Sequence, residues 1–329
     1  MNSLVDPLPG DSPRFSLHDF APAQESFEDA VVEGLSGPRK SVPARFLYDE
    51  AGSRLFDCIC ELPEYYPTRT ELKILTDKAD EIGASIGPDI ALLEFGAGSS
   101  QKARLLLDAL ERPAAYEPID VSREHLIRLA DEIADAYPGL AVRAICADYT
   151  QPLELPDSEP RRRRAGFFPG STIGNLTSAE ARAFLSGWAG QLGRDGLMVV
   201  GVALRAPSSI VLPAYDDAQG VTARFTANVL VRANRELGAD FDVAAFRHTP
   251  TYDETTGRLT IHLTSLKAQT VHLAGRRFDF AEGEQLHVEE SNKYAAEDFQ
   301  ALARSAGYVA ETVWIDPGEL FSVHVLRVA

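Results

Sequence analysis

The stretch that decides the fold is IALLEFGAGSSQKARLLLDALE (90–111). Its apolar run, 90–95, ends at Gly96-Ala97-Gly98, and apolar residues at helical spacing follow over 102–111. A short apolar run bounded by glycines predicts a buried strand, and the later spacing predicts an amphipathic helix. Glycines at such a turn let the backbone approach a ligand closely, because there is no Cβ to clash. The stretch therefore predicts a strand, turn and helix of an α/β sheet, with a ligand site at the turn.

The same alternation continues along the chain on the C-terminal side of this stretch. We expect further strands at 114–120, 141–149, 165–170 and 197–204, with helices at 123–136 and 178–192. Strands that alternate with helices predict a parallel sheet covered on both faces. The pattern resumes near the C-terminus with a helix at 295–307 and strands at 308–316 and 321–329.

The segment between these two stretches breaks the alternation. It contains the pattern of one long helix, at about 213–237, and then alternating β segments, GRLTIHLTSLKAQTVHL and QLHVEESN. We therefore expect three parts. They are a flexible N-terminal arm over 1–25, a second lobe made of 26–85 plus 206–294, and an α/β domain made of 86–205 plus 295–329.

Composition restricts the partners of the protein. Its 329 residues include 49 acidic and 32 basic ones, a formal charge of −17. Such a surface repels phosphate backbones and anionic lipids, so we expect neither nucleic acid nor membrane as a partner. Three cysteines without zinc-site spacing, and no signal-peptide or membrane-span pattern, favour a metal-free cytoplasmic protein. We expect a monomer that acts on a small molecule.

The turn after the first strand distinguishes between nucleotide ligands. A dinucleotide fingerprint needs a third glycine three positions after Gly98, and Gln101 stands there. An acidic residue before the first glycine, Glu94, and polar residues after the second suit a nucleoside without pyrophosphate. A nicotinamide dehydrogenase is the disfavoured alternative.

Polar residues at the next two strand ends support a nucleoside site. Asp120 can accept hydrogen bonds from both ribose hydroxyls, while Asp148 can meet an adenine amino group and Tyr149 can pack on the base. Each carboxylate taken alone could instead cap a helix or lie in a solvated loop. Carboxyl ends of parallel strands share one edge of a sheet, where open α/β sheets bind ligands. The predicted nucleoside-binding residues are Gly96, Gly98, Lys102, Asp120, Asp148 and Tyr149, although Lys102 could equally be a surface lysine.

Several longer motifs carry a family resemblance from about residue 40 to the C-terminus. They are PARFLYDEAGSRLFDCICELPEYYPTRTE (43–71), FGAGSSQKARLLLDAL (95–110), YEPIDVS (116–122), PGSTIGNLT (169–177), AYDDAQGVTARFTANVL (214–230) and HVEESNKY (287–294). In this order they resemble the L-histidine Nα-methyltransferase family, which makes the trimethylated histidine precursor of ergothioneine. The resemblance implies a class I methyltransferase Rossmann-like sheet with an inserted α+β substrate-binding lobe. In such sheets the last strand lies antiparallel beside the fifth.

The resemblance also implies an acceptor site. Asn175 and Tyr215 would hold the substrate carboxylate. Tyr65, Glu289 and Ser291 would surround the imidazole, and Tyr48 and the backbone at Gly170 would lie near the amine, with Tyr48 and Asn175 acting in catalysis. Neutral donors suit a carboxylate, Glu289 can accept from an imidazole N–H, and Ser291 can serve the other ring nitrogen. Without the resemblance, Tyr65 would be interpreted as core packing and Glu289 as part of a solvated strand face.

Two departures from the family pattern affect this expectation. The family commonly has Gly-x-Asp-Leu-x-Lys after the fifth strand, and here Ala203 and Ala206 stand at the Asp and Lys positions. An ion pair or a contact that positions the lobe is then missing. Ile261 stands where the family often has methionine near the imidazole pocket, and this changes the pocket's shape.

Together with the strand-end residues, the resemblance implies an S-adenosylmethionine (SAM)-dependent methyltransferase that binds SAM at Gly96, Gly98, Lys102, Asp120, Asp148 and Tyr149 and trimethylates the α-amino group of L-histidine to hercynine, the ergothioneine precursor. The sulfonium is already activated, so the protein has to present a neutral amine in line with the S–CH₃ bond. Two alternatives stay open: the same chemistry on a different amino acid, and a non-catalytic partner protein that keeps the fold.

Overall fold

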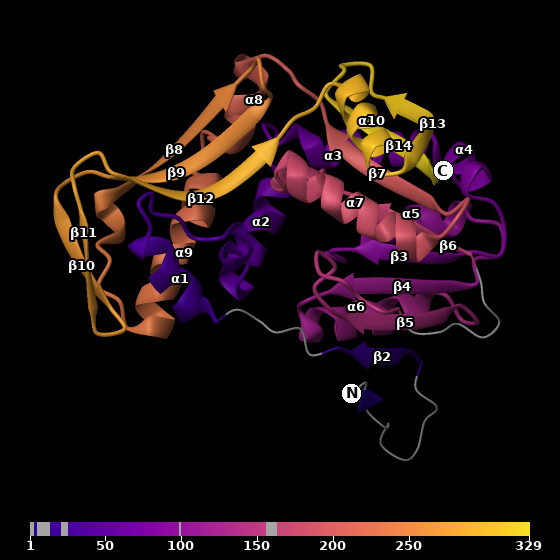
Figure 1. The fold of residues 1–329 in the computed structure, drawn as a ribbon, viewed down its shortest axis with the longest axis horizontal. Helices are drawn as coiled ribbons and strands as arrows, with labels where there is room; N and C mark the ends of the chain where they lie inside the picture. Colours follow the sequence, from indigo (N-terminus) through magenta and orange to yellow (C-terminus); the bar gives the residue numbers. More distant parts are fainter. Residues whose placement is uncertain (1–2, 5–13, 21–25, 99, 156–162) are drawn as a thin grey trace. The chain divides into compact units, whose positions relative to one another are not determined.

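The central sheet of the first part of the chain runs through nine strands among the described residues (Figure 1). The computed structural model describes residues 3–4, 14–20, 26–98, 100–155 and 163–329. The strand order across the sheet is β1 (Ser3–Leu4), β2 (Ser16–Asp19), β5 (Ala141–Cys146), β4 (Ala115–Asp120), β3 (Ala91–Phe95), β6 (Arg164–Phe168), β7 (Leu197–Ala203), β14 (Phe321–Val328) and β13 (Tyr308–Ile315). From β2 to β7 every neighbouring pair is parallel. β14 is antiparallel to both β7 and β13, which is the predicted closing of a class I methyltransferase sheet.

Helices cover both faces of this sheet, and each face has its own apolar core. They are α3 (Tyr66–Asp77), α4 (Ala79–Ile86), α5 (Ser100–Ala109), α6 (Arg123–Ala136), α7 (Ser178–Leu192) and α10 (Ala296–Ser305). One core joins α4, α5 and α6 to the strand residue Leu92, and the other joins α7 and α10 to Leu93. Successive residues of a strand point to opposite faces. The doubly covered α/β sheet predicted from the sequence is therefore present.

The N-terminal segment differs from its prediction. Residues Ser16–Asp19 form β2, which pairs in parallel with β5, and Ser3–Leu4 form β1, which pairs antiparallel with β2. The prediction of a flexible arm over 1–25 is therefore wrong for these six residues. The apolar residues Phe15 and Leu17 pack against the core, and this gives the segment a reason to dock. Residues 1–2, 5–13 and 21–25 of the predicted arm lie outside the described residues.

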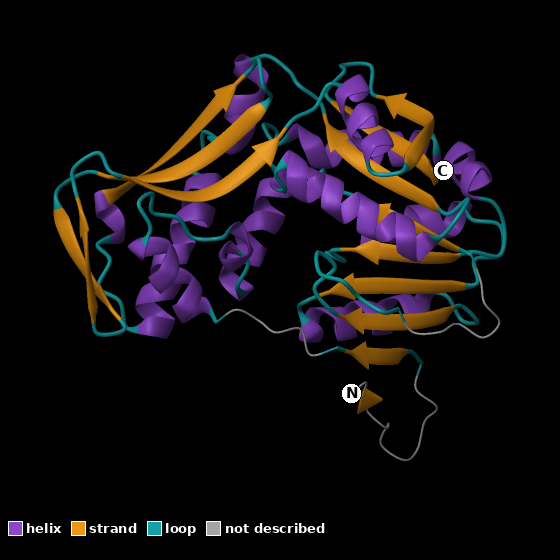
Figure 2. Cartoon of the chain, in the orientation of Figure 1, coloured by secondary structure: helices purple, strands orange, loops and turns teal. Residues whose placement is uncertain are grey.

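The second part of the chain is an α+β unit (Figure 2). Its elements are α1 (Phe27–Ser36), η1 (Ala44–Leu47), α2 (Glu50–Glu61), α8 (Ser208–Tyr215), α9 (Val221–Leu237), η3 (Val243–Ala245), β8 (Phe246–Asp253), β9 (Arg258–Ser265), β10 (Gln269–Leu273), β11 (Arg276–Phe280) and β12 (Gln285–Asn292). Strands β12, β9 and β8 form one antiparallel sheet, and β10 and β11 form a hairpin.

The chain divides into two compact units at slightly different places from those predicted. The first comprises Met1–Ala23, Thr70–Leu204 and Tyr294–Ala329, and the second comprises Gln24–Arg69 and Arg205–Lys293. Residues 70–85 therefore group with the α/β unit and not with the second lobe. No helix in the described part of the chain is long and apolar enough to span a membrane.

One predicted helix is interrupted. The long helix expected at about 213–237 is broken into α8, which ends at Tyr215, and α9, which begins at Val221. The Asp217 carboxylate accepts the backbone N–H groups of Val221 and Thr222 at 2.9 and 2.8 Å, and Gly220 has a left-handed φ of 66°. These bonds satisfy amides that a new helix start would leave without partners. The break places Tyr215 at a helix end.

Candidate active site

The glycine turn after β3 lies at the edge of the sheet where β3, β4 and β5 end. Gly96 has φ +69°, and its N–H donates to the Ile119 carbonyl at 3.0 Å. An added Cβ at Gly96 would lie 3.4 Å from the Tyr149 hydroxyl, so the turn is closely packed on that side. On α6, His125 Nε2 lies 2.8 Å from the Ala97 carbonyl and donates to it. Gly98 is exposed, and Ser99 of this motif lies outside the described residues.

The two predicted nucleoside carboxylates are held in local turns at this edge. Asp120, the last residue of β4, accepts the Ser122 N–H at 2.7 Å, and burial raises the pKa of its carboxyl. Asp148 accepts both the N–H and the hydroxyl of Thr150, at 2.9 and 2.6 Å. Each carboxylate is thus oriented by its own turn, and the structure brings both beside the glycine turn because β3, β4 and β5 are adjacent in the sheet.

Tyr149 belongs to an aromatic cluster at the same edge. Its ring makes edge contacts with Phe95, Phe168 and Phe184 at centroid distances of 6.0, 5.8 and 6.1 Å. Its backbone carbonyl accepts the Trp188 indole N–H at 3.0 Å. An aromatic ring fixed from several sides provides a rigid apolar surface for a base.

Glu94 has a different environment from the one suggested by its place in the motif. Its carboxyl is 1% exposed and accepts a hydrogen bond from the Tyr116 hydroxyl. Burial raises the pKa of Glu94 to about 7, although the Tyr116 bond and the nearby Lys102 oppose the shift. The hydrogen-bond partner of Glu94 is therefore Tyr116 on the neighbouring strand β4, inside the sheet.

A second buried carboxylate, Glu71 on α3, joins the glycine turn's helix to the loop after β6. Lys102 on α5 donates to Glu71 at 2.6 Å, and the Gly170 N–H lies 2.8 and 2.9 Å from the two carboxylate oxygens. Glu71 is fully buried. Lys102 is therefore no plain surface lysine. The sequence interpretation missed Glu71, although it lies at the end of the quoted motif 43–71.

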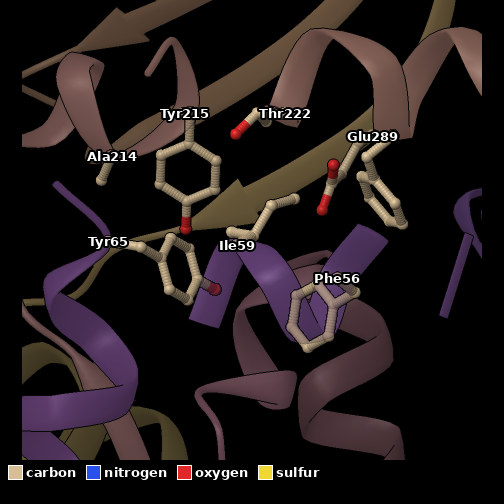
Figure 3. Close-up of a pocket in the computed structure, with 8 residues that line it drawn as sticks. Phe56, Ile59, Tyr65, Ala214, Tyr215, Thr222 and Glu289 are labelled. Carbon is tan, nitrogen blue, oxygen red and sulfur yellow. The ribbon is translucent and has the colours of Figure 1, made fainter. Parts of the chain in front are cut away.

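The pocket of the second unit has an aromatic wall and one carboxylate (Figure 3). Its lining residues are Phe56, Ile59, Tyr65, Ala214, Tyr215, Thr222, Phe225 and Glu289. They leave about 230 Å³ free of protein atoms, part of it open to solvent. Three of the predicted imidazole and carboxylate ligands, Tyr65, Tyr215 and Glu289, are brought together here.

These three side chains come from separate elements and face one space (Figure 3). Tyr65 precedes α3, Tyr215 ends α8, and their rings meet edge to face at 5.9 Å. Burial raises the pKa of Tyr65, so it is a neutral hydroxyl donor. Burial also raises the pKa of Glu289 on β12 to about 7, while the nearby Lys293 lowers it. Glu289 is 8% exposed, so the interpretation of a solvated strand face does not hold.

Ser291 lies two residues further along β12 and contacts Tyr215. The two hydroxyl oxygens are 3.2 Å apart, and Lys293 donates to both. Lys293 was not among the predicted site residues. The sequence does contain a signal for it, because Glu289, Ser291 and Lys293 are spaced by two and would share one face of an extended strand.

The remaining predicted acceptor residues lie at several places. Tyr48 is 39% exposed and its ring packs on Phe56 and Phe225 at 5.4 and 5.2 Å. Asn175, the last residue of η2 (Thr172–Asn175), and Gly170 are exposed and belong to the first unit. Ile261 is fully buried and is the cross-strand partner of Glu289.

Ala203 and Ala206 stand where an acidic and a basic residue were expected. Ala203, at the end of β7, is fully buried, and its N–H donates to the Ser171 hydroxyl at 2.9 Å. This bond ties β7 to the turn before η2 without a charged side chain. Among the described residues, no group of three or more His, Cys, Asp or Glu side chains is placed to hold a metal ion.

Sequence comparison connects this geometry to a known family. A family model described as histidine-specific, SAM-dependent methyltransferase matches residues 27–328. The chain belongs to this family. It is 40% identical to the histidine N-alpha-methyltransferase of Mycolicibacterium smegmatis over 307 residues, and these residues cover 92% of this chain and 94% of that protein. It is 38% identical over 292 residues to the histidine N-alpha-methyltransferase of Mycobacterium tuberculosis, with 87% and 90% covered.

A third relative is the ergothioneine biosynthesis protein 1 of Schizosaccharomyces pombe. It is 29% identical over 282 residues, which cover 82% of this chain and 36% of that protein. This histidine-specific methyltransferase family member is therefore a SAM-dependent N-methyltransferase.

Proposed function

We propose that this methyltransferase transfers three methyl groups to the α-amino group of L-histidine and so makes hercynine, the ergothioneine precursor. The observation that carries the proposal is the pocket in which Glu289 faces Tyr65 and Tyr215, with Ser291 and Lys293 next to Tyr215. The names of the mycobacterial and fission-yeast relatives support the α-amino acceptor and the pathway.

The edge of the first unit fits the methyl donor. The turn at Gly96 brings backbone close to the Tyr149 ring, and two oriented carboxylates, Asp120 and Asp148, end the neighbouring strands. We propose that Asp120 holds the ribose hydroxyls, that Asp148 meets the adenine amino group and that Tyr149 packs on the base. When bound, SAM supplies a methyl group that its sulfonium has already activated.

The polar groups of the pocket in the second unit match the hydrogen-bonding needs of an imidazole. A ring with one N–H and one bare nitrogen needs one acceptor and one donor. Glu289 would accept from the N–H, and the Ser291 hydroxyl would donate to the other nitrogen. Tyr65 would close the apolar face of the ring, and Tyr215 would donate to the substrate carboxylate.

The amine has to lose its proton before each transfer. We propose that the Tyr48 hydroxyl oxygen takes the proton of the substrate ammonium while the hydroxyl's own hydrogen passes to water, so that the amine becomes neutral and Tyr48 is unchanged. The Gly170 N–H already donates to Glu71, so an amine at this loop would meet the Gly170 carbonyl oxygen. The aromatic faces of Phe56 and Phe225 beside Tyr48 would tolerate the final trimethylammonium cation.

The direct test is to incubate the purified protein with SAM and each of the twenty amino acids and to follow the products by mass. We expect additions of one, two and three methyl groups to histidine. Ile261 opposite Glu289 is the reason to include the others, since a branched side chain there changes the pocket. Methylation of another amino acid with histidine untouched would replace the proposed acceptor.

The predicted role of Asn175 provides a second measurement. Asn175→Ala should raise the KM for histidine about 10-fold, as expected for one lost hydrogen bond to a charged group, and leave the Kd for S-adenosylhomocysteine unchanged in calorimetry. Equal losses for both ligands would mean that Asn175 is wrongly assigned. We also propose that the protein acts as a monomer; light scattering should then give 35.8 kDa.

A further inference from the structure

Lys293 is a buried lysine whose role the methyl-transfer scheme leaves open. It directly follows β12, is 2% exposed, and lies in the described interior of the second unit. Its ammonium donates to the Tyr215 hydroxyl at 2.6 Å and to the Ser291 hydroxyl at 2.7 Å. The same ammonium lies 4.8 Å from the centre of the Tyr215 ring. A buried ammonium is costly, so this placement requires an explanation.

The backbone also holds Lys293 in place. Its N–H donates to the Gly257 carbonyl at 2.7 Å. An added Cβ at Gly257 would come within 2.1 Å of the Lys293 carbonyl oxygen, and Gly257 has φ +74°. The turn between β8 and β9 therefore keeps the lysine in one position at the end of β12.

The hydrogen-bond chemistry of an ammonium fixes the direction of its neighbours. It has three donors and no acceptor, so the oxygens of Tyr215 and Ser291 both accept from Lys293. Each hydroxyl then has one hydrogen left. At 3.2 Å the two hydroxyls can share at most one of these hydrogens, so at least one hydrogen has to find an acceptor elsewhere.

Charge gives the second part of the argument. The reactive acceptor has a neutral amine and a carboxylate and is therefore an anion, and it has to bind to a protein of formal charge −17. The pocket already contains the Glu289 carboxylate. Lys293 is the cation whose field reaches Glu289, and it is joined to Tyr215, the proposed carboxylate donor.

We propose that Lys293 determines specificity for an amino-acid carboxylate: its charge favours an anionic acceptor, and its bonds to Tyr215 and Ser291 leave both hydroxyls as donors, Tyr215 toward the carboxylate and Ser291 toward the imidazole nitrogen. This inference rests on the proposed function, because it assigns Lys293 to the same acceptor site. Lys293 is a positioning residue, since it acts through two hydroxyls and touches no reacting atom.

A pair of acceptors separates this role from a merely structural one. L-histidine has the carboxylate, and L-histidinamide replaces it with a neutral amide of similar size. Lys293→Met removes the charge and keeps an unbranched side chain that is one heavy atom shorter. We expect kcat/KM for histidine to fall about 10- to 100-fold, the usual effect of losing a hydrogen bond to a charged group, and kcat/KM for histidinamide to fall less than about 3-fold.

Three controls accompany this measurement. Lys40→Met removes an equivalent charge in the same unit, where Lys40 pairs with Glu284 and lies 4.9 Å from the Phe280 ring, and it should leave both acceptors unaffected. The Kd for S-adenosylhomocysteine should be the same in all variants. Tyr215→Phe keeps the lysine but removes the receiving hydroxyl. Tyr215→Phe should show the selective loss of kcat/KM for histidine even if Lys293→Met fails to fold. When Lys293→Met is combined with Tyr215→Phe, kcat/KM for histidine should fall by less than about a further 3-fold.

The outcomes distinguish the inference from the function on which it rests. If the unmodified enzyme leaves histidine unmethylated, the proposed function fails. If the unmodified enzyme methylates histidine, two results for Lys293→Met would show that the carboxylate role of Lys293 is wrong. One is an equal loss of activity on histidine and histidinamide, and the other is no loss on either acceptor. The same holds if Tyr215→Phe shows no preference between the two acceptors.

Discussion

The buried carboxyl group of Glu289 is proposed to bind the imidazole, and it also makes the stability of the folded protein depend on pH. Burial raises the pKa of its carboxyl from 4.5 to about 7. The groups that face it are Lys293 at the end of its own strand, Tyr65 before α3 and Tyr215 on α8. Between these pKa values the unfolded chain has lost a proton that the folded protein keeps. Stability from this group is thus complete below pH 4.5 and is lost as the pH rises through about 7, by roughly 3 kcal/mol.

Glu289→Gln tests both aspects. The variant should be more stable than the unmodified protein at pH 8, by up to about 3 kcal/mol, and equal to it near pH 4, as measured by urea unfolding. It should also lose histidine methylation, because an amide is a poorer acceptor for the imidazole N–H than a carboxylate. The matched control is Glu290→Gln, whose carboxylate pairs with Arg258 at 2.7 Å and has a lowered pKa. That variant should gain no stability at pH 8, and a gain equal to that of Glu289→Gln would contradict the assignment.

At the scale of elements, a single glycine of β7 makes room for the Glu71 network. A Cβ at Gly201 would lie 2.1 Å from a Glu71 oxygen and 3.2 Å from the Phe321 ring. Glu71 is fully buried and bonded to both Lys102 and Gly170, so it has no free space into which to move. The packing of β7 against α3 therefore fixes Glu71, which in turn holds Lys102 at the start of α5 and Gly170 in the loop after β6.

Gly201→Ala should consequently weaken S-adenosylhomocysteine binding about 10-fold or more and destabilise the protein by about 1–3 kcal/mol, through overpacking. Calorimetry and urea unfolding measure the two effects. Gly187→Ala on α7 is the matched control, because nothing lies within 4 Å of its added Cβ. In a helix this change should stabilise by about 0.5–1 kcal/mol and leave binding unaltered. Normal binding by Gly201→Ala would show that the Glu71 network does not support the donor site.

Elements with strong local patterns were predictable from the sequence, and those that depend on distant partners were not. Helices 123–136 and 178–192 have the bounds predicted, because their apolar spacing and flanking residues are local. The break at Asp217 depends on a capping carboxylate inside an otherwise helical pattern. The strand Ser16–Asp19 exists only through pairing with β5, which lies over a hundred residues away in sequence.

The candidate site shows the same division. The strand-end residues Gly96, Asp120 and Tyr149 follow from the alternation of strands and helices, and the family motifs supply Tyr65, Tyr215 and Glu289. Glu71 and Lys293 were missed because a charged residue in a sequence is expected at the surface. Only the fold shows that each is buried and which polar groups it serves.

At the scale of the whole molecule, the residues proposed to bind the methyl donor and those that line the acceptor pocket belong to different units. The donor residues Asp120, Asp148 and Tyr149 belong to the first unit, while Tyr65, Tyr215 and Glu289 belong to the second. Each set is held by bonds and packing within its own unit. Because each set is held within its own unit, changes to one set should act on one ligand.

Asp120→Ala should raise the Kd for S-adenosylhomocysteine about 10- to 100-fold, because it removes the acceptor for the ribose hydroxyls. Glu289→Gln should leave that Kd within about 2-fold of the unmodified protein, and the double variant should show the Asp120→Ala effect alone. Asp77→Ala, in an exposed pair with Lys73 at 2.7 Å, controls for loss of acidic charge in the first unit. The net charge of −17 makes this control necessary, since removing any carboxylate changes the overall field. A Glu289 variant that loses S-adenosylhomocysteine binding as strongly as Asp120→Ala would contradict the division of ligands between the units.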